Sequence, residues 1–84
     1  MAEQDIRVYG APWCPDCKRS KQFLNEHRIP YEWHDIDQDS AAREYVVKAN
    51  NGRRTVPTIL FPDGFMLVEP SNAELADKLQ IADR

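Results

Sequence analysis

Hydrophobic and polar residues alternate along two stretches of the chain, and between these stretches the apolar positions follow a helical period. Residues 6–10 (IRVYG) and 31–37 (YEWHDID) alternate, which predicts two strands. The helix between them begins at Pro15 and ends before Pro30, because proline disfavours helical geometry at the residue that precedes it. A strand–helix–strand order predicts that the two strands run parallel. The side chains expected on the inner face of this helix are Cys17, Phe23, Leu24 and His27.

The second half of the chain predicts another helix, a hairpin and a last helix. Asp39 or Ser40 can cap the first of these helices, and the glycine of "NNG" at 50–52 ends it. A "PDG" turn joins two strands at 58–61 and 65–68 into an antiparallel hairpin. A Ser-x-x-Glu capping box then opens the last helix. The apolar side chains expected to point inward from these two helices are Ala42, Tyr45, Val46, Ala49, Leu75, Leu79 and Ala82.

The order of elements is therefore βαβ, then α, then ββα, which predicts an α/β fold. We expect a central four-stranded mixed sheet, flanked by three helices that cover both of its faces. The chain has 84 residues, enough for one hydrophobic core but not for two. We therefore expect a single domain over residues 1–84.

Composition and charge are those of an ordinary soluble globular protein, with 42% hydrophobic and 30% charged residues. The net charge of −3 is small and mixed in sign, so neither nucleic acid nor an anionic membrane is expected as a partner. No run approaches the ~20 apolar residues that cross a bilayer. The first ten residues are acidic and lack the apolar region of a signal peptide. We expect a cytoplasmic monomer.

The chain has two cysteines, Cys14 and Cys17, within the sequence "WCPDC". A structural disulfide is unusual in the cytoplasm, and closing so short a loop would stabilise the fold by only about 2 kcal/mol. Half of a zinc site is the main alternative, but the remaining candidate ligands, His27 and His34, lie on separate elements without the usual spacing. We expect no bound metal. A CxxC pair beside a βαβ unit is typical of a redox-active dithiol.

Cys14 is predicted at the junction of strand and helix, where Pro15 suits the first helical position. Free backbone N–H groups at a helix start favour an anion, so we expect an exposed Cys14 sulfur that ionises readily, with Cys17 one turn further on. A stabilised thiolate is a good leaving group and raises the reduction potential. Asp16 brings a negative charge to the same turn, and we expect it to make the protein more reducing. Pro15 and Asp16 are thus expected to tune the ionisation of Cys14.

Several neighbouring residues are candidates for contacts with a partner. Trp13 can shield the thiol, form a docking surface for a partner, or simply pack, and the sequence leaves these alternatives open. Arg53 and Arg54 can clamp a carboxylate of a small thiol or belong to a solvated loop. The N–H groups at Asn72 and Ala73 can hold a second anionic group.

The last helix and the residues before the hairpin complete the set of candidates. For Ser71 and Glu74, simple capping of the last helix is favoured over ligand binding. "RTVPT" at 54–58 places a proline just before a strand, where it cannot donate to the sheet. Such a proline is tolerated at the first residue of a strand, beside backbone that a ligand approaches, and its peptide bond can be cis.

"WCPDC" at 13–17, together with "TVP" at 55–57 in this order of elements, resembles the glutaredoxin branch of the thioredoxin superfamily. The resemblance extends from about Ile6 to Leu79. It implies a thioredoxin-like, glutaredoxin-type fold. It also implies the roles of individual residues. Cys14 would be the nucleophile and Cys17 the resolving thiol, and Pro57 would be a cis-proline that faces them. The Val56 backbone would pair with an extended substrate, and Thr55 would belong to the same wall.

Three positions depart from the classical dithiol glutaredoxins. Asp16 stands where they usually have tyrosine, Ala11 where they commonly have lysine, and "EPSN" at 69–72 where they carry Gly-Gly. The stretch "NGRRTVPTILFPDG", with "EPS" after it, is more similar to the mycoredoxin-like group, which is recharged by mycothiol. Small redoxins that accept electrons from thioredoxin reductase and donate them to ribonucleotide reductase are also similar in size.

The resemblance therefore implies a thiol–disulfide oxidoreductase that reduces S-thiolated proteins or protein disulfides. Its electron donor would be a low-molecular-weight thiol, mycothiol or glutathione, and it would need no bound cofactor. Two alternatives remain open at this point. One is a redoxin recharged by a flavoprotein reductase, and the other is a module that binds a metal or an iron–sulfur cluster.

Overall fold

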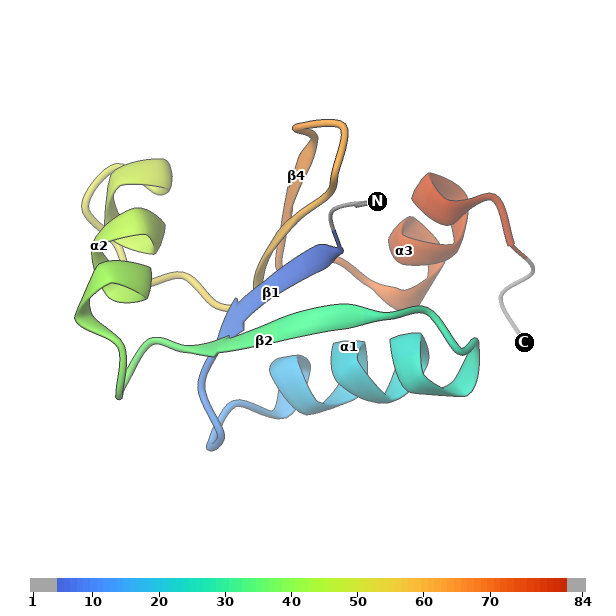
Figure 1. The fold of residues 1–84 in the computed structure, drawn as a ribbon, viewed down its shortest axis with the longest axis horizontal. Coiled ribbons are helices and arrows are strands. Elements are labelled where there is room, and N and C mark those ends of the chain that lie inside the picture. The colour runs from blue at the N-terminus through green and yellow to red at the C-terminus, as the bar shows by residue number, and fades with distance from the viewer. Residues whose placement is uncertain (1–4, 82–84) are drawn as a thin grey trace.

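The computed structural model describes residues 5–81, and these residues form one mixed sheet with helices on both faces (Figure 1). The strands lie in the order β2-β1-β3-β4. β1 and β2 are parallel, whereas β3 runs antiparallel to both β1 and β4. The strands are β1 (Ile6–Gly10), β2 (Tyr31–Asp35), β3 (Thr58–Leu60) and β4 (Met66–Val68). The helices are α1 (Pro15–Glu26), α2 (Ser40–Ala49) and α3 (Asn72–Leu79).

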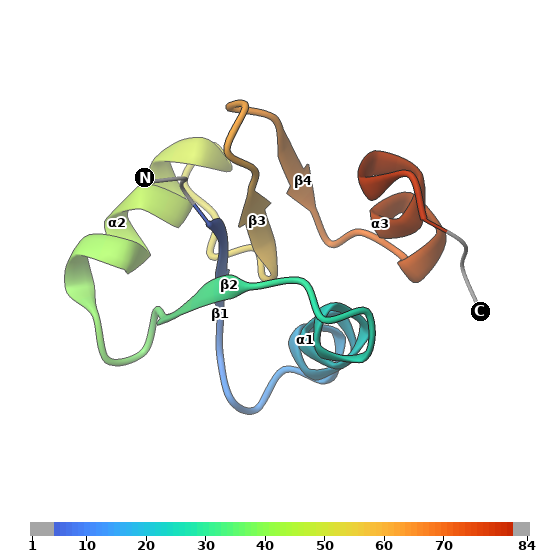
Figure 2. The ribbon, with the colours of Figure 1, turned by 45° about the vertical axis from the view of Figure 1, so that its right-hand side comes forward.

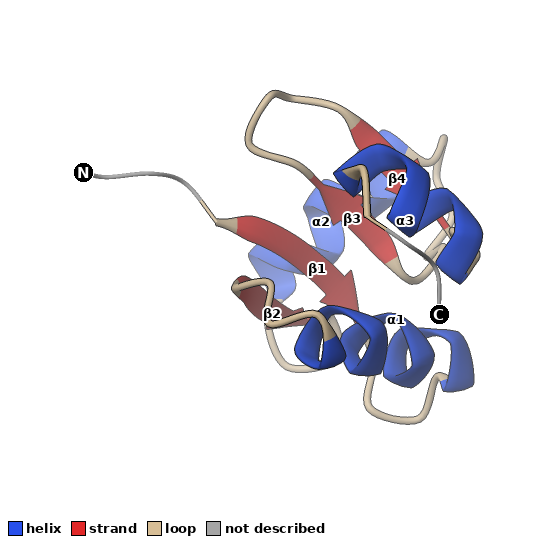
Figure 3. Ribbon diagram, turned by 90° about the vertical axis from the view of Figure 1, so that its right-hand side faces the viewer, coloured by secondary structure: helices blue, strands red, loops and turns tan. Residues whose placement is uncertain are grey.

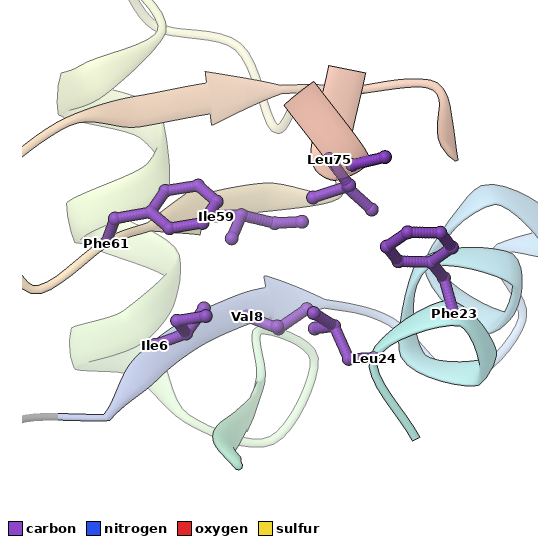
Figure 4. Packing of buried hydrophobic residues seen from close by; sticks show 8 residues of the cluster. Ile6, Val8, Phe23, Leu24, Ile59, Phe61 and Leu75 are labelled. Carbon is purple, nitrogen blue, oxygen red and sulfur yellow. The ribbon is translucent and has the colours of Figure 1, made fainter. Parts of the chain in front are cut away.

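The helices are divided between the two faces of the sheet, as the order of elements predicted (Figures 2 and 3). α1 and α3 cover one face, and α2 covers the other. The hydrophobic cluster on the α1 and α3 side is shown in Figure 4 and consists of Ile6, Val8, Phe23, Leu24, Ile59, Phe61, Leu75 and Ala76. The cluster that includes α2 and the cysteines consists of Tyr9, Ala11, Cys14, Cys17, Ile36, Ala42, Val46 and Val56.

Alternation along β1 divides its side chains between these two clusters. Ile6 and Val8 point to the α1 and α3 side, and Tyr9 points to the α2 side. Arg7 stays exposed and pairs with Glu32 of the neighbouring strand, at 3.7 Å. The period-two pattern of this strand is therefore confirmed.

Two of the predicted helix caps are confirmed. The Asp39 carboxylate accepts hydrogen bonds from the N–H groups of Ala41 and Ala42, at 3.0 and 3.1 Å, at the start of α2. Ser71 and Glu74 form the complete capping box of α3. None of the helices within residues 5–81 is long and apolar enough to cross a membrane.

β2 ends two residues earlier than the alternation of residues 31–37 predicted. Asp35 turns the chain there, because its carboxylate accepts the N–H of Asp37 at 2.9 Å. Its carbonyl also accepts the N–H groups of Gln38 and Asp39, at 3.1 and 2.9 Å. These local hydrogen bonds compete with the ladder and end the strand. The two hairpin strands are also shorter than predicted, by one residue each.

The end of α2 also differs from its prediction. Ala49 is exposed rather than inward, because the helix stops at that residue. Asn51 as well as Gly52 adopts a left-handed conformation, with φ of 57° and 92°, and the Gly52 N–H donates to the Val47 carbonyl at 2.7 Å. His27 caps α1 and lies just outside it. Ala82, which was expected to face inward, lies outside the described residues.

Candidate active site

Cys14 lies between β1 and α1, as the sequence predicted. Its N–H donates to the carbonyl of Ala11 at 3.2 Å, which closes a turn after the strand. Pro15 then begins the helix and leaves Cys14 at the capping position with an extended backbone. The Cys14 sulfur accepts the N–H of Cys17 at 3.2 Å. The sulfur is thus held at the positive end of the helix.

The Cys14 side chain is buried, so the expectation of an exposed sulfur is wrong. Cys14 is only 5% exposed. The cause is the segment before β3, which was expected to face the cysteines but not to cover them. The Cys14 thiol donates to the Val56 carbonyl at 3.9 Å, and Ala11 packs in the same cluster. A partner can therefore reach this sulfur only over a small area, next to the backbone of Val56.

Cys17 is enclosed completely and differs strongly from Cys14. It has no exposed surface. Burial, together with the hydrogen bond to Cys14, raises the pKa of the Cys17 thiol to about 12. The Asp16 carboxylate adds a smaller contribution to the same rise of the Cys17 pKa. At neutral pH Cys17 is therefore protonated and inaccessible.

Gly10, the last residue of β1, makes room for Cys17. A Cβ atom at this position would lie 2.6 Å from the Cys17 sulfur and 2.9 Å from the ring of Trp33. These distances are shorter than van der Waals contact, so no larger residue fits without displacing its neighbours. Lys21 lies 3.7 Å from the centre of the Trp33 ring.

The segment Thr55 to Pro57 forms a wall beside Cys14. The Val56–Pro57 peptide bond is cis, as the resemblance implied. The Thr58 hydroxyl donates to the Thr55 carbonyl at 2.8 Å, and Asn50 donates to that hydroxyl at 3.2 Å. These bonds fix the wall from the α2 side. Thr55 is half-buried, and Val56 and Pro57 are buried.

Asp16 is exposed in the first turn of α1 and forms an ion pair. Its carboxylate accepts a hydrogen bond from the Arg19 guanidinium at 3.3 Å. The Arg19 guanidinium is thus the cation in contact with the Asp16 charge. Arg19 is half-buried, which no local pattern in the sequence indicates.

Trp13 is 66% exposed, which rules out simple packing in the core. Its indole N–H donates to the Asp37 carboxylate at 2.8 Å. This bond connects the turn before α1 with the turn after β2. The ring is thereby held in place next to Cys14 with much of its surface accessible, which favours a docking surface among the alternatives.

The two arginines expected to clamp a carboxylate are exposed, whereas the residue that caps α3 is engaged in hydrogen bonds. Arg53 is exposed and lines a hollow of about 370 Å³ together with Thr55 and Val68. Arg54 is exposed as well. Ser71 is engaged in the capping box, as favoured, because its N–H already donates to the Glu74 carboxylate at 2.8 Å.

Neither histidine lies with the cysteine pair. The His27 ring packs at a tilt against Phe23 at the end of α1 opposite to Cys14, about 18 Å away for a helix of this length. His34 stacks on Tyr9 and contacts Glu32 at 3.2 Å. Within residues 5–81, no three His, Cys, Asp or Glu side chains gather closely enough to hold a metal ion.

Sequence reasoning missed Gly10, Asp37 and the contacts of Arg19 outside its own helix. The spacing of Asp16 and Arg19, three residues apart in a helix, could have indicated their ion pair. The crowding at Gly10 and the bond between Trp13 and Asp37 arise only when distant segments meet in the fold. The sequence carries no local signal for them.

The family model described as glutaredoxin matches residues 6–66. A candidate glutaredoxin of Mycobacterium tuberculosis, Rv3198A, is 43% identical over 79 residues, which cover 94% of this chain and 94% of that one. Mycoredoxin 1 of Corynebacterium glutamicum is 34% identical over 76 residues, which cover 90% of this chain and 94% of that one.

Solved structures show the same arrangement of elements. A single-substitution variant of the thioredoxin-like protein BC3987 superposes with a TM-score of 0.81 at 30% identity, covering 98% of this chain and 100% of that one. A glutaredoxin from Archaeoglobus fulgidus superposes with a TM-score of 0.73 at 25% identity, covering 95% of this chain and 88% of that one. The expected fold class is therefore confirmed.

Proposed function

The chain belongs to the glutaredoxin family of thiol–disulfide oxidoreductases, and from this premise we propose that it reduces S-thiolated proteins and protein disulfides with Cys14 as nucleophile and mycothiol or glutathione as electron donor. The observation that carries this proposal is the contrast between the two sulfurs. One sulfur caps a helix and faces the wall at Val56, and the other is enclosed beneath it. Only the first can meet a substrate.

The substrate of the first step is a protein whose cysteine is joined to the small thiol in a mixed disulfide. The Cys14 thiolate attacks the small-thiol sulfur of that disulfide. A disulfide forms between Cys14 and that small thiol, and the protein leaves as a thiolate that takes up a proton. The N–H of Cys17, which donates to the Cys14 sulfur at 3.2 Å, stabilises the negative charge on that sulfur before the attack.

In the second step a thiol attacks the Cys14 sulfur and restores the enzyme. A second molecule of the small thiol releases a small-molecule disulfide and returns the Cys14 thiolate. Alternatively, Cys17 attacks, releases the small thiol and leaves a Cys14–Cys17 disulfide, which two further thiols reduce while they become a disulfide themselves. Once Cys14 is in a mixed disulfide, its hydrogen bond and charge no longer raise the Cys17 pKa. Cys17 therefore ionises more readily when it is needed.

The substrate would lie along the wall. We infer that an extended segment pairs with the Val56 backbone and passes Thr55 and Pro57. Trp13 would offer its exposed ring on the other side of Cys14. Arg53 and Arg54 would attract a carboxylate of the substrate from the exposed loop before the wall, and the N–H groups of Asn72 and Ala73 at the start of α3 would hold a second anionic group.

The roles of the cysteines are tested with a peptide that carries mycothiol or glutathione in a mixed disulfide. Cys17→Ser should still release the peptide thiol, because only one sulfur is needed when the small thiol completes the cycle. Cys14→Ser should abolish the release. Chromatography of the peptide products measures both outcomes. An equal loss in the two variants contradicts the assignment.

The electron donor is tested separately. Oxidised protein is incubated with mycothiol, with glutathione, or with NADPH and thioredoxin reductase, and alkylation of the cysteines followed by mass spectrometry reports the recovery of the dithiol. Faster recovery with mycothiol or glutathione supports the proposal. Recovery with thioredoxin reductase alone shows that a flavoprotein reductase is the donor and overturns the small-thiol part.

A further inference from the structure

Arg19 connects α1 to the segment between β4 and α3. Besides its ion pair with Asp16, the guanidinium donates to the side-chain oxygen of Asn72 at 3.1 Å. Both terminal nitrogens also donate to the carbonyl oxygen of Pro70, each at 3.3 Å. A planar guanidinium offers several donors in a fixed arrangement, so one side chain can hold all three oxygens at once.

The same segment also holds the wall beside Cys14. The Glu69 N–H donates to the Pro57 carbonyl at 2.8 Å, and the neighbouring Val56 carbonyl accepts from the Cys14 thiol. Contacts thus continue from Arg19 through residues 69–72 and the wall back to Cys14. Two uncharged oxygens, of Pro70 and Asn72, fix the guanidinium in place.

The position of the Asp16 carboxylate matters because its charge acts on Cys17. Burial is the main cause of the raised pKa of Cys17, and Asp16 contributes to it as well. A carboxylate in the first turn of a helix is attracted to the free N–H groups at the helix start, and here these lie around Cys14. Arg19 lies one turn further along, and its ion pair with the carboxylate ties that charge to the guanidinium.

From these contacts we propose that Arg19 is a positioning residue of the redox site. Anchored on Pro70 and Asn72, it holds the Asp16 carboxylate in an ion pair and thereby sets the reduction potential of the Cys14–Cys17 pair. This proposal rests on the function proposed above, because it requires that the two thiols form a reversible disulfide.

The potential is measured by equilibrating the protein with reduced and oxidised dithiothreitol. The Cys14–Cys17 disulfide accepts two electrons and two protons from reduced dithiothreitol, which closes its own cyclic disulfide, and the ratio of the four species gives the equilibrium constant for reduction. Asp16→Asn should raise this constant, because the thiolate loses a repelling charge. Arg19→Gln should lower it, because Asp16 is released toward Cys14.

The two substitutions should not be additive. Asp16→Asn should raise the constant about two- to fivefold more in the Arg19→Gln background than in the wild-type protein, which is the range of coupling expected for an ion pair near the surface. Lys18→Gln is the matched control, since it removes an exposed cation from the neighbouring position. Its effect and that of Asp16→Asn should be additive.

Asn72→Ala tests the anchoring of Arg19 without removing a charge, because Asn72 is uncharged. It should lower the constant when Asp16 is present and leave it unchanged in the Asp16→Asn background. Arg19→Lys keeps the charge but not the planar arrangement of donors, and it should give a constant between those of wild type and Arg19→Gln. Far-UV circular dichroism checks that each variant is folded.

Additive effects of Arg19→Gln and Asp16→Asn, or equal effects of Asn72→Ala in both backgrounds, overturn the role of Arg19 and leave the proposed function intact. One other result overturns both the role of Arg19 and the proposed function. If Cys14 and Cys17 form no disulfide in any dithiothreitol mixture, the pair is not the redox centre, and Arg19 has no potential to set.

Discussion

Cys14 and Cys17 stand three residues apart and have different surroundings. Cys14 faces a backbone carbonyl and retains a small exposed area, whereas Cys17 is enclosed by Gly10 and Trp33. The difference arises from the helix, because a residue one turn further along lies deeper beneath the end of β1. Two residues of the same type can therefore take different roles, one in attack and the other in release.

The buried Cys17 thiol makes stability depend on pH. Its pKa is raised from 9.0 to about 12, chiefly by burial, so the folded protein keeps a proton that the unfolded chain loses above pH 9. This contribution to stability is complete below pH 9 and is lost as pH rises toward 12, with a slope of up to about 1.4 kcal/mol per pH unit.

Urea unfolding of the reduced protein between pH 8 and about 11 measures this slope. Cys17→Ala should remove it, because no thiol remains to titrate there, while the tyrosines contribute equally to both proteins. Parallel slopes in the wild-type protein and Cys17→Ala would show that Cys17 does not hold its proton in this range.

The surroundings of Gly10 are so crowded that one added methyl group should have a large effect on stability. Gly10→Ala should lower the free energy of unfolding by about 1–3 kcal/mol, because the new Cβ would overlap the Cys17 sulfur and the Trp33 ring. Urea denaturation measures the loss. In the Cys17→Ala background the same substitution should cost less. A change below about 0.5 kcal/mol in the wild-type protein, which is typical of an uncrowded surface position, contradicts the packing described here.

The residues that could be predicted from the sequence are those whose chemistry is local. The cysteine spacing, Pro15 and the proline of "TVP" indicate a thiol site next to a helix start, and all of them lie together in the structure. The burial of Cys14 could not be predicted, because the covering wall comes from a position 42 residues away. The anchoring of Arg19 by Pro70 and Asn72 is long-range for the same reason.

At the scale of elements, the segment between β4 and α3 combines an irregular backbone with hydrogen bonds to two distant parts of the chain. Glu69 adopts a left-handed conformation with φ of 52°. Its N–H nevertheless binds Pro57, and Pro70 and Asn72 bind Arg19. Glu69 therefore has an unfavourable backbone conformation, while it and the residues that follow it make these contacts.

Replacing Glu69 with glycine should therefore stabilise the protein. Glu69→Gly should raise the free energy of unfolding by about 0.5–1 kcal/mol, because glycine adopts this conformation without a steric cost, although its unfolded chain is more flexible. Thermal unfolding measures the gain. Glu69→Ala is the matched control and should not be stabilising, since it keeps the Cβ atom. A loss of stability in Glu69→Gly contradicts this reasoning.

Local hydrogen bonding explains which element boundaries the sequence could predict. The capping residues Asp39, Ser71 and Glu74 act within one turn of their own helix, so their pattern was sufficient. The end of β2 was predicted two residues too late. There the alternation continued in the sequence, but Asp35 offered its neighbours hydrogen bonds that the alternation does not reveal.

For the whole molecule, the two hydrophobic clusters lie on opposite faces of the sheet. The cysteines belong to the cluster shared with α2, and Ile6 belongs to the cluster under α1 and α3. Ile6 also lies four residues before Gly10 on β1, which is about 13 Å along a strand. The sequence predicted both layers, since the alternation of β1 already assigned its side chains to two faces.

Ile6→Ala should thus weaken the fold without changing the active site. The free energy of unfolding should fall by about 2–5 kcal/mol, as expected for a buried isoleucine, and guanidinium unfolding measures it. The equilibrium constant for reduction by dithiothreitol should stay within about twofold of the wild-type value, because distant sites are usually independent. A shift of tenfold would show that the two clusters act as one unit.

The closeness of Trp33 to Cys17 has an optical consequence. The ring and the sulfur both lie within 3 Å of the point where a Cβ atom of Gly10 would be, and Trp33 is partly shielded from solvent while Trp13 is largely exposed. Sulfur quenches indole emission at short range, and a disulfide quenches more strongly than a thiol. The short-wavelength part of the tryptophan fluorescence should therefore fall when the dithiol oxidises, so the protein's own emission reports formation of the Cys14–Cys17 disulfide without an added dye.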